Sequence, residues 1–402
     1  MPASCPALSP KPSYILSPGA MAVFSFVAAT LLAASSGAPT PIYFLYQQSM
    51  HLSSLAVTVV FAVYAFSLLA AMLTVGRLSD HVGRKPVILA SLLANLIAMA
   101  IFAIASSLEH LILARAVQGV AVGTGVAALG ATILDTERTH GALLNSIFVF
   151  LGLLIGTLVS ALLVTFAPNP LHLVYEVLLA GTAILVALLW LMPETAPRKP
   201  GAWPSLRPQV GAPRQSRALL LRLTPANVAT WAFGGFFLSL MPALVTTTLH
   251  AASPLIGGLV VASLTATATA VIAPLRNQPP RRLVLAGTAA LVIGVAISLA
   301  GIGEGSAAIL LAGAVIAGVG FGANFSGTLR SLLPTAEPHQ RAGLLAVYYL
   351  QSYLAFSLPT LAAGLTVPRI GLATTAYIYG AVVIALSLGS LAVALIAARA
   401  RR

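Results

Sequence analysis

The sequence predicts an all-α membrane protein of twelve transmembrane helices, arranged as two six-helix halves related by pseudo-symmetry. Three observations predict this fold class: an extreme apolar composition, recurring apolar runs of membrane-spanning length, and glycine patterns that repeat between the halves. Apolar residues make up 59% of the 402 residues and charged residues only 7%. Soluble domains carry about 25% charged residues, so the composition excludes an ordinary soluble fold.

The apolar runs form two groups of six, separated by a long polar segment. A helix needs about 20 apolar residues to cross a bilayer, where its backbone groups must bond internally. The first six predicted spans are 20–43, 52–75, 86–106, 109–133, 142–166 and 172–192, and the second six are 225–249, 254–275, 283–302, 307–329, 343–366 and 373–398. The prolines around Ser36 and Gly37, and Pro359 in the eleventh span, indicate helix kinks.

The polar segment 193–223 predicts a linker between the two halves. It begins "PETAPRKPGAWPSLRPQVGAPRQSR" and lacks apolar periodicity. The predicted organisation is therefore an N-terminal bundle at 20–192, a C-terminal bundle at 224–398, and two cytoplasmic tails at 1–19 and 399–402. The first tail has no charged start leading into a short apolar core, so it does not read as a cleaved signal.

The distribution of Lys and Arg predicts the orientation in the membrane. Nineteen of the 21 basic residues fall on one side of the predicted spans, leaving Arg369 on the other side and Arg115 within a span. Because basic loops stay in the cytoplasm, both termini and the linker are expected there, in a bacterial inner (plasma) membrane. This topology and contact with anionic lipid explain the net charge of +13, so no nucleic-acid partner is expected.

A shift of 197 residues relates features of the two halves. It carries Gly123, Gly125 and Gly130 onto Gly320, Gly322 and Gly327, and Arg84 and Lys85 onto Arg281 and Arg282. The same shift replaces Gly76 by Ala273 and Asp80 by Asn277, so the second copy keeps its cations and loses its acid. One shift that aligns two separated features predicts a duplicated bundle.

The sequence offers no chemistry for an enzyme, an ATP-driven pump or a metal site. It contains no phosphate-binding glycine loop and no nucleophile triad, and its seven His and eight acidic residues are scattered. Cys5 is the only cysteine, which excludes an internal disulfide and a cysteine-based metal cluster. We therefore expect no cofactor, and a monomer whose partners are lipid, a small-molecule substrate and protons.

Two motifs carry a resemblance to a known family. "GRLSDHVGRKP", residues 76–86, and "RAVQGVAVGTG", residues 115–125, are similar to the two signatures of the major facilitator superfamily, and especially to its multidrug and small-metabolite exporters. The resemblance implies transport by alternating access. Two departures weaken an assignment to proton-coupled antiporters: Gly156 is followed by Thr157 instead of Pro, and the first span has no acidic residue.

The first motif predicts a gating latch on the cytoplasmic surface. A glycine lets two helices approach closely, and an acid near a helix end accepts backbone bonds or pairs with a nearby Arg. The resemblance implies a third member at the end of the fourth span, where Asp135 stands and Glu137 competes with it. The predicted latch therefore consists of Gly76, Asp80, Gly83, Arg84 and Asp135.

The second motif places Arg115 inside the membrane, where an ion normally faces a cavity or a partner. Two roles stay open: contact with an anionic or zwitterionic substrate, or a structural Arg held by carbonyls and Gln118.

Glu176, in the sixth span, is the remaining acid near the membrane, and is expected as either a proton site or an interfacial residue. The resemblance implies a central cavity, for which the polar and aromatic candidates are Tyr43, Gln118, Asn145, Asn227, Trp231, Asn324, Gln351 and Tyr353, with interhelical hydrogen bonds or interface anchoring as the alternative for each.

The sequence thus predicts a secondary transporter, and more specifically a proton-driven exporter of drugs or metabolites. A facilitator or importer of a small anionic or zwitterionic metabolite is one alternative. A transport-dead receptor on the same fold is another.

Overall fold

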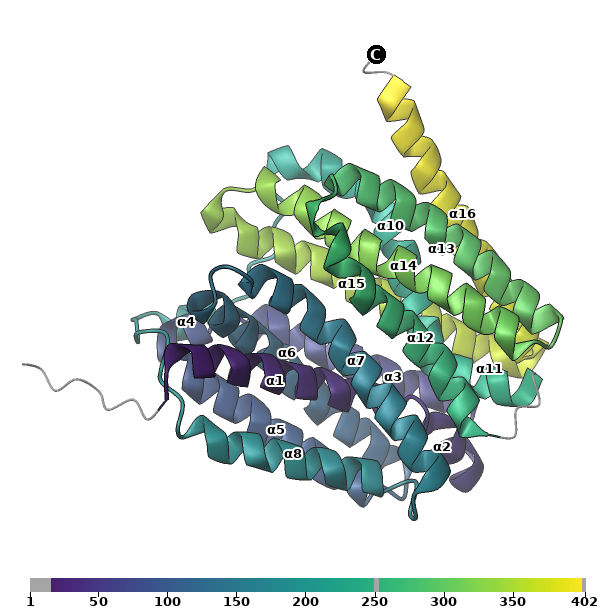
Figure 1. The fold of residues 1–402 in the computed structure, drawn as a ribbon, viewed down its shortest axis with the longest axis horizontal. Coiled ribbons are helices and arrows are strands. Elements are labelled where there is room, and N and C mark those ends of the chain that lie inside the picture. Colours follow the sequence, from purple (N-terminus) through teal and green to yellow (C-terminus); the bar gives the residue numbers. More distant parts are fainter. Residues whose placement is uncertain (1–15, 249–252, 400–402) are drawn as a thin grey trace, which may run out of the picture.

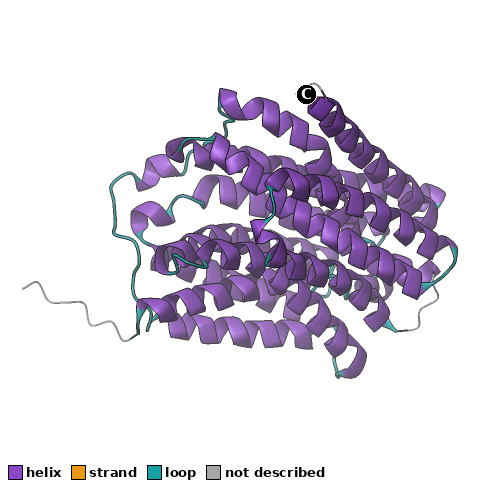
Figure 2. Cartoon of the chain, turned by 45° about the horizontal axis from the view of Figure 1, so that its top comes forward, coloured by secondary structure: helices purple, strands orange, loops and turns teal. Residues whose placement is uncertain are grey.

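The computed structural model describes residues 16–248 and 253–399, and within these ranges the regular structure is helical throughout (Figure 2). The tail residues 1–15, which include Cys5, and residues 400–402 lie outside the described part. The helices form two bundles packed side by side, α1 to α8 in one and α10 to α16 in the other (Figure 1). This arrangement confirms the predicted all-α fold of two halves.

The first half contains α1(Pro18–Gly37), α2(Tyr43–Ser49), α3(Ser54–Val75), α4(Ser79–Val82), α5(Arg84–Ala103), α6(Leu108–Thr136), α7(Gly141–Phe166) and α8(Leu173–Leu189). The short α9(Ala202–Ser205) lies in the linker. The second half contains α10(Arg214–Ser239), α11(Met241–Thr248), α12(Pro254–Ile272), α13(Pro280–Gly303), α14(Ala307–Leu332), α15(Arg341–Ile370) and α16(Leu372–Arg399), with short 3₁₀ turns at Pro274–Asn277, Leu333–Thr335 and Pro338–Gln340.

Each predicted span corresponds to helix in the structure. Among the described residues, ten helices are long and apolar enough to cross a membrane. The pair α10 and α11 passes the same test as one bent span, and α8 is a shorter apolar helix of 17 residues. Apolar side chains on all sides of such helices make them soluble in lipid, so many large apolar residues remain exposed on the outer surface.

Two predicted boundaries were wrong. The first span is not continuous over 20–43, because α1 ends at Gly37 and the prolines that follow enforce a turn before α2. The seventh span does not begin at 225: α10 already begins at Arg214, inside the predicted linker, and the α10–α11 pair bends by 57° at Leu240. The sequence-based prediction missed this extension because basic residues at the start of α10 interrupt the apolar run, although Arg does not disfavour a helix.

The duplication is visible in how glycines pack, but its register differs from the predicted one. In α6, a Cβ at Gly119 or Gly123 would clash with the backbone of α3, and in α14 a Cβ at Gly318 or Gly322 would clash in the same way with α12. These equivalent pairs are 199 residues apart, two more than the shift of 197 that aligned glycines of α6 and α14 by sequence. Close approach of helix backbones therefore identifies the matching positions better than glycine identity does.

The halves touch each other along α3 with α15 and α7 with α12. Far from the linker these contacts are made by small residues: a Cβ at Gly364 would clash with Thr58, and one at Gly258 would clash with Ala161. Thr58 is fully buried there. The two halves are therefore in tight contact at this end, which we call the far end.

Candidate functional site

A cavity of about 420 Å³ lies between the halves. Its lining comes from α1, α3, α6 and α7 on one side and from α10, α12, α14 and α15 on the other. At one end it reaches Gly76, Arg77 and the linker residue Gln209, and we call this the linker end. Toward the far end, Phe61 and Phe356 face each other with ring centroids 4.8 Å apart. The cavity is therefore accessible from the linker end and closed at the other.

The lining of the cavity is mainly apolar and aromatic. One continuous aromatic surface, which we call the aromatic wall, consists of Trp231, Phe321, Phe325, Tyr353 and Phe356. No Asp or Glu is among the lining residues, and the cations that line it are Arg115, deep in the cavity, and Arg77 at the linker end. The site is therefore apolar with a single deep positive charge.

Arg115 is buried, with 1% of its surface exposed, and all its hydrogen-bond partners are uncharged. Its Nε donates to the Tyr43 hydroxyl at 3.0 Å, and its Nη2 donates to the same oxygen. Its Nη1 donates to the Gln118 Oε1 at 2.6 Å and to the Ser36 carbonyl at 3.2 Å. The guanidinium also lies 5.1 Å from the Tyr64 ring centroid, a cation–π contact.

The break in the first span explains why Arg115 stands where it does. Because α1 ends at Gly37, the carbonyls of its last turn lack helical partners and carry the negative end of the helix dipole. Arg115 donates to the Ser36 carbonyl, and the Gln118 Nε2 donates to the Ser35 carbonyl at 2.8 Å. The spacing of three residues puts both side chains on one face of α6, where they cap α1.

The other cavity candidates separate into two groups. Asn145, Trp231 and Tyr353 line the cavity with Arg115, whereas Tyr43 and Gln118 lie behind Arg115 and hold it.

Three further candidates lie outside the lining. The Asn324 amide donates to Thr230 at 2.9 Å and accepts from Thr288, and Asn227 donates to Ser352 at 3.0 Å, so both join helices. Gln351 is half-buried on α15. Glu176 is exposed on α8, away from the cavity, and forms no ion pair with a described residue.

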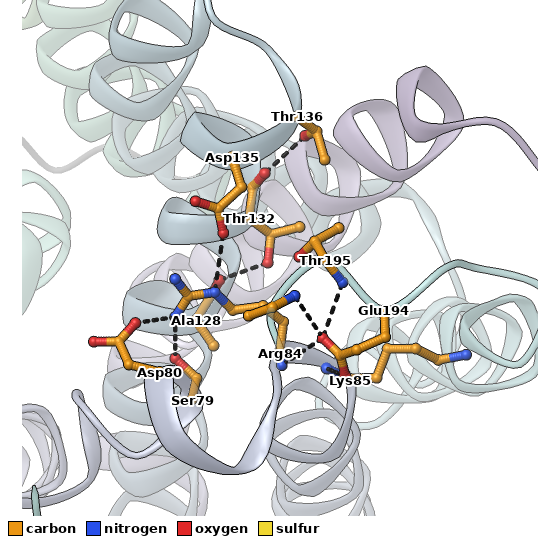
Figure 3. A network of polar contacts seen from close by, with 11 residues as sticks. Ser79, Asp80, Arg84, Lys85, Ala128, Thr132, Asp135, Thr136, Glu194 and Thr195 are labelled. Carbon is orange, nitrogen blue, oxygen red and sulfur yellow. Dashed lines mark hydrogen bonds and ion pairs between the residues drawn. The ribbon is translucent and has the colours of Figure 1, made fainter. Parts of the chain in front are cut away.

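The two acids of the latch, Asp80 and Asp135, lie around the guanidinium of Arg84 (Figure 3). Its Nη1 lies 2.5 Å from the Asp80 carboxylate and donates to the Ser79 hydroxyl at 2.7 Å, while its Nε lies 3.1 Å from the Asp135 carboxylate. Asp135, and not Glu137, is the third member: Glu137 instead accepts from backbone N–H groups of its own loop. The cluster joins α4, α5 and α6 by charge-assisted bonds.

Gly83 makes the sharp entry into α5 possible. Its φ of +100° is a conformation that other residues avoid. A Cβ there would also press on the carboxylate of Glu194. Gly76 follows α3 at its C-terminal end and lines the cavity at the linker end.

Glu194 is a fourth acid in this region, which the sequence-based latch does not contain. Its carboxylate accepts from the backbone N–H groups of Arg84 at 2.7 Å and of Lys85 at 3.1 Å, and so caps the start of α5 (Figure 3). Gly83 precedes α5 and has no side chain to cap it, which is the signal that an acceptor must come from elsewhere. The Lys85 Nζ also donates to the Met192 carbonyl at 2.6 Å. The end of the sixth span is thus tied to the latch.

All latch residues belong to the first half. In this conformation the cluster is formed while the cavity is accessible at the same end, so the ion pairs do not by themselves close the cavity. They fix the α3–α5 connection to α6 as one unit.

Two helical bundles enclosing an apolar cavity accessible from one end define the class of the protein: a membrane transporter that carries a small molecule. The family model of the Major Facilitator Superfamily matches residues 25–358. The chain belongs to this superfamily of secondary transporters, and it is not an enzyme.

Solved structures share the fold. A nucleoside transporter, NupG, has a TM-score of 0.69 at 13% identity, covering 94% of this chain and 98% of that one. A POT family transporter in complex with 5-aminolevulinic acid has a TM-score of 0.73 at 13% identity, covering 93% of this chain and 95% of that one.

Curated relatives match part of the chain. The multidrug resistance protein MdtL of Klebsiella pneumoniae is 28% identical over 158 residues, which are 38% of this chain and 40% of that protein. An MFS-type transporter of Aspergillus terreus is 30% identical over 177 residues, which are 38% of this chain and 31% of that protein. The chain thus matches less than half the length of these relatives.

Proposed function

We propose that this secondary transporter is an exporter of drugs or small metabolites that uses the proton gradient and works by alternating access. The observation that carries the proposal is the cavity between the halves, accessible at the linker end and closed at the far end by Phe61 against Phe356. Partial similarity to proteins named for multidrug resistance supports export.

The contacts between the halves suit a rocking motion. At the far end small residues touch across the interface, as Gly258 does with Ala161, so the large side chains that must part there are those of the Phe61–Phe356 pair. Rotation of one rigid bundle against the other then opens the far end and closes the linker end. In our proposal the latch supports the closed linker end by holding the α3–α5 connection rigid.

We also propose that the linker end faces the cytoplasm of a bacterial cell, with both termini on that side. The basic residues support this orientation, because Arg77, Lys85 and Arg207 stand at the linker end and Arg369 near the far end. A reporter inserted after Val210 in the linker is expected to read as internal, and an external reading would contradict the orientation.

A facilitator or importer of a small anionic or zwitterionic metabolite is the second candidate. One observation favours it: the lining contains no carboxylate to carry a coupled proton. A transport-dead receptor is disfavoured, since Gly76, Asp80 and Arg84 are all present and the ion pairs are formed.

Purified protein tests these candidates. A screen for ligands that raise the unfolding temperature identifies compounds that bind the native state. Uptake of such a ligand into liposomes is then measured with and without a pH gradient. A proton-driven exporter accumulates the ligand only with the gradient, a facilitator equilibrates it in both cases, and a receptor binds without uptake.

A further inference from the structure

We propose that the substrate is an aromatic carboxylic acid, bound as its anion with the carboxylate at the Arg115 end of the cavity and the rings against the aromatic wall. This inference rests on the proposed transport function, to which it adds a substrate class. Three features of the cavity carry it: an unneutralised charge, a continuous aromatic surface, and hydrogen-bond donors without partners.

The charge of Arg115 is not neutralised by the protein. Its partners are a phenol, an amide and a backbone carbonyl, and no described carboxylate lies within ion-pair distance of it. Arg115 borders a cavity whose lining contains no Asp or Glu, and the other lining cation, Arg77, stands at the linker end. In surroundings of low dielectric such a charge attracts an anion and repels a cation even without direct contact. The cavity therefore selects by charge.

The aromatic wall provides a surface for a planar apolar body. The Trp231 ring centroid lies 5.4 Å from that of Tyr353, 5.9 Å from those of Phe321 and Phe356, and 6.4 Å from that of Phe325. These rings come from three helices, and tilted and edge-on arrangements leave faces and edges available to a further ring. An aliphatic body would lose the stacking part of this attraction.

Two donors in the cavity wall are without partners among the described residues. The Trp231 Nε1 is buried and makes no hydrogen bond, although the indole lines the cavity. The indole N–H can only donate, and its neighbour is the buried Tyr348 hydroxyl, which also lacks a partner among the described residues. The Asn145 amide, across the cavity on α7, lines it without a hydrogen bond to a described side chain or backbone group. The Asn145 NH₂ group is therefore the donor in this wall that a ligand with oxygen acceptors would engage.

The volume sets the size of the substrate. Pockets for small organic molecules range from about 300 to 1,000 Å³. A cavity of about 420 Å³ is at the lower end of this range and fits a body of one or two fused rings. 2-Naphthoate is therefore a suitable probe.

Calorimetric titration of the full chain in detergent tests the proposal with four probes. 2-Naphthoate is compared with 2-naphthamide, which is neutral, with 2-naphthylmethylammonium, which is cationic, and with decahydro-2-naphthoate, which keeps the charge and loses the aromatic rings. We expect 2-naphthoate to bind at least tenfold more tightly than the amide and the ammonium, and several-fold more tightly than the saturated acid.

Two variants locate the site. Arg115→Gln is expected to remove the preference for carboxylate over amide. Asn145→Asp replaces an amide by a carboxylate of nearly the same size on the cavity wall, so it is a second variant that does not disturb the contacts of Arg115, and it is expected to weaken 2-naphthoate binding at least tenfold. Arg369→Gln is the matched control, since it removes one exposed cation outside the cavity and is expected to leave all four affinities unchanged.

Equal or tighter binding of the ammonium, no binding of 2-naphthoate at about 1 mM, or unchanged affinity in both variants would overturn the proposal. None of these results touches the proposed transport function, which is tested separately by uptake into liposomes with and without a pH gradient.

Discussion

The two halves of the chain share one fold but carry different chemistry. In the first half, α6 supplies Arg115 and Gln118 to the cavity region. At the positions 199 residues later, α14 has Ala314 and Ala317, both fully buried and apolar. The second half instead contributes all five residues of the aromatic wall. The first half thus places a charge at the cavity, and the second half places the aromatic wall there. The two halves have kept the same helix packing, whereas their cavity-facing residues have diverged.

The connections that follow α3 in the first half and α12 in the second half are also held by different contacts. In the first half, Arg84 pairs with Asp80 and Asp135. In the second half, Arg330 at the end of α14 donates to the carbonyls of Leu275 at 3.4 Å and Gln278 at 3.0 Å, and no described acid takes part. In the second half, therefore, Arg330 holds the equivalent connection through backbone carbonyls and without an acidic partner among the described residues. The latch is therefore a property of one half.

The largest effect is expected at Arg115. Arg115→Ala leaves the Tyr43 hydroxyl, Gln118 and the Ser36 carbonyl without their partner, and it removes the only deep charge of the cavity. Arg115→Lys restores the charge but not the forked geometry, so both variants are expected to slow uptake at least about tenfold. Uptake of a ligand from the stabilisation screen measures this. If Arg115→Ala transports and binds normally, the residue serves only to cap α1.

Removing the latch cation sharpens the comparison between the halves. Arg84→Ala leaves Asp80 and Asp135 without their ion pairs and is expected to lower the unfolding free energy by about 1–3 kcal/mol, since both carboxylates are partly exposed. Arg281, which the sequence shift of 197 residues aligns with Arg84, is exposed, so Arg281→Ala is expected to cost less than about 0.5 kcal/mol. Unfolding in detergent measures both, and equal losses would remove the distinction.

The smallest effect concerns the loops before α7 and α15. Backbone N–H groups of His140 and Thr139 hold the pKa of Glu137 below its usual value. A lowered folded-state pKa stabilises the fold above the unfolded-state pKa, and this contribution is lost as the pH falls through the folded-state value.

Glu137→Gln is therefore expected to lower the unfolding temperature slightly at pH 7, by about 1 °C or less, and to have no effect in acid. Glu337 stands 200 residues later and accepts no backbone bond among the described residues. Glu337→Gln is thus the control, expected to change nothing at either pH, and a larger effect there than at Glu137 would contradict the comparison.

How much the sequence reveals depends on the range of the interaction. The spans and the Asp80–Arg84 pair follow from local patterns, because apolar runs and a spacing of four residues determine them. Asp135 was predicted from the family resemblance. Glu194 was missed, since it caps α5 from 110 residues away. The apolar residues of the aromatic wall were missed because Phe in a membrane span usually faces lipid or core, and sequence alone does not say which.

The reciprocal accessibility of the two ends tests the central claim, alternating access, most directly. In a Cys5→Ala background, cysteines are introduced singly at Ala342, which lines the cavity near the linker end, and at Thr58, which is buried at the far end. Reaction with a thiol reagent is measured with and without Asp80→Asn. The latch makes its ion pairs within the first half, and in our account it favours the state closed at the linker end by holding the α3–α5 connection rigid.

Asp80→Asn is therefore expected to speed labelling at position 342 and slow labelling at position 58, with ligand binding retained. Rates that change in the same direction, or do not change at either position, would contradict the account.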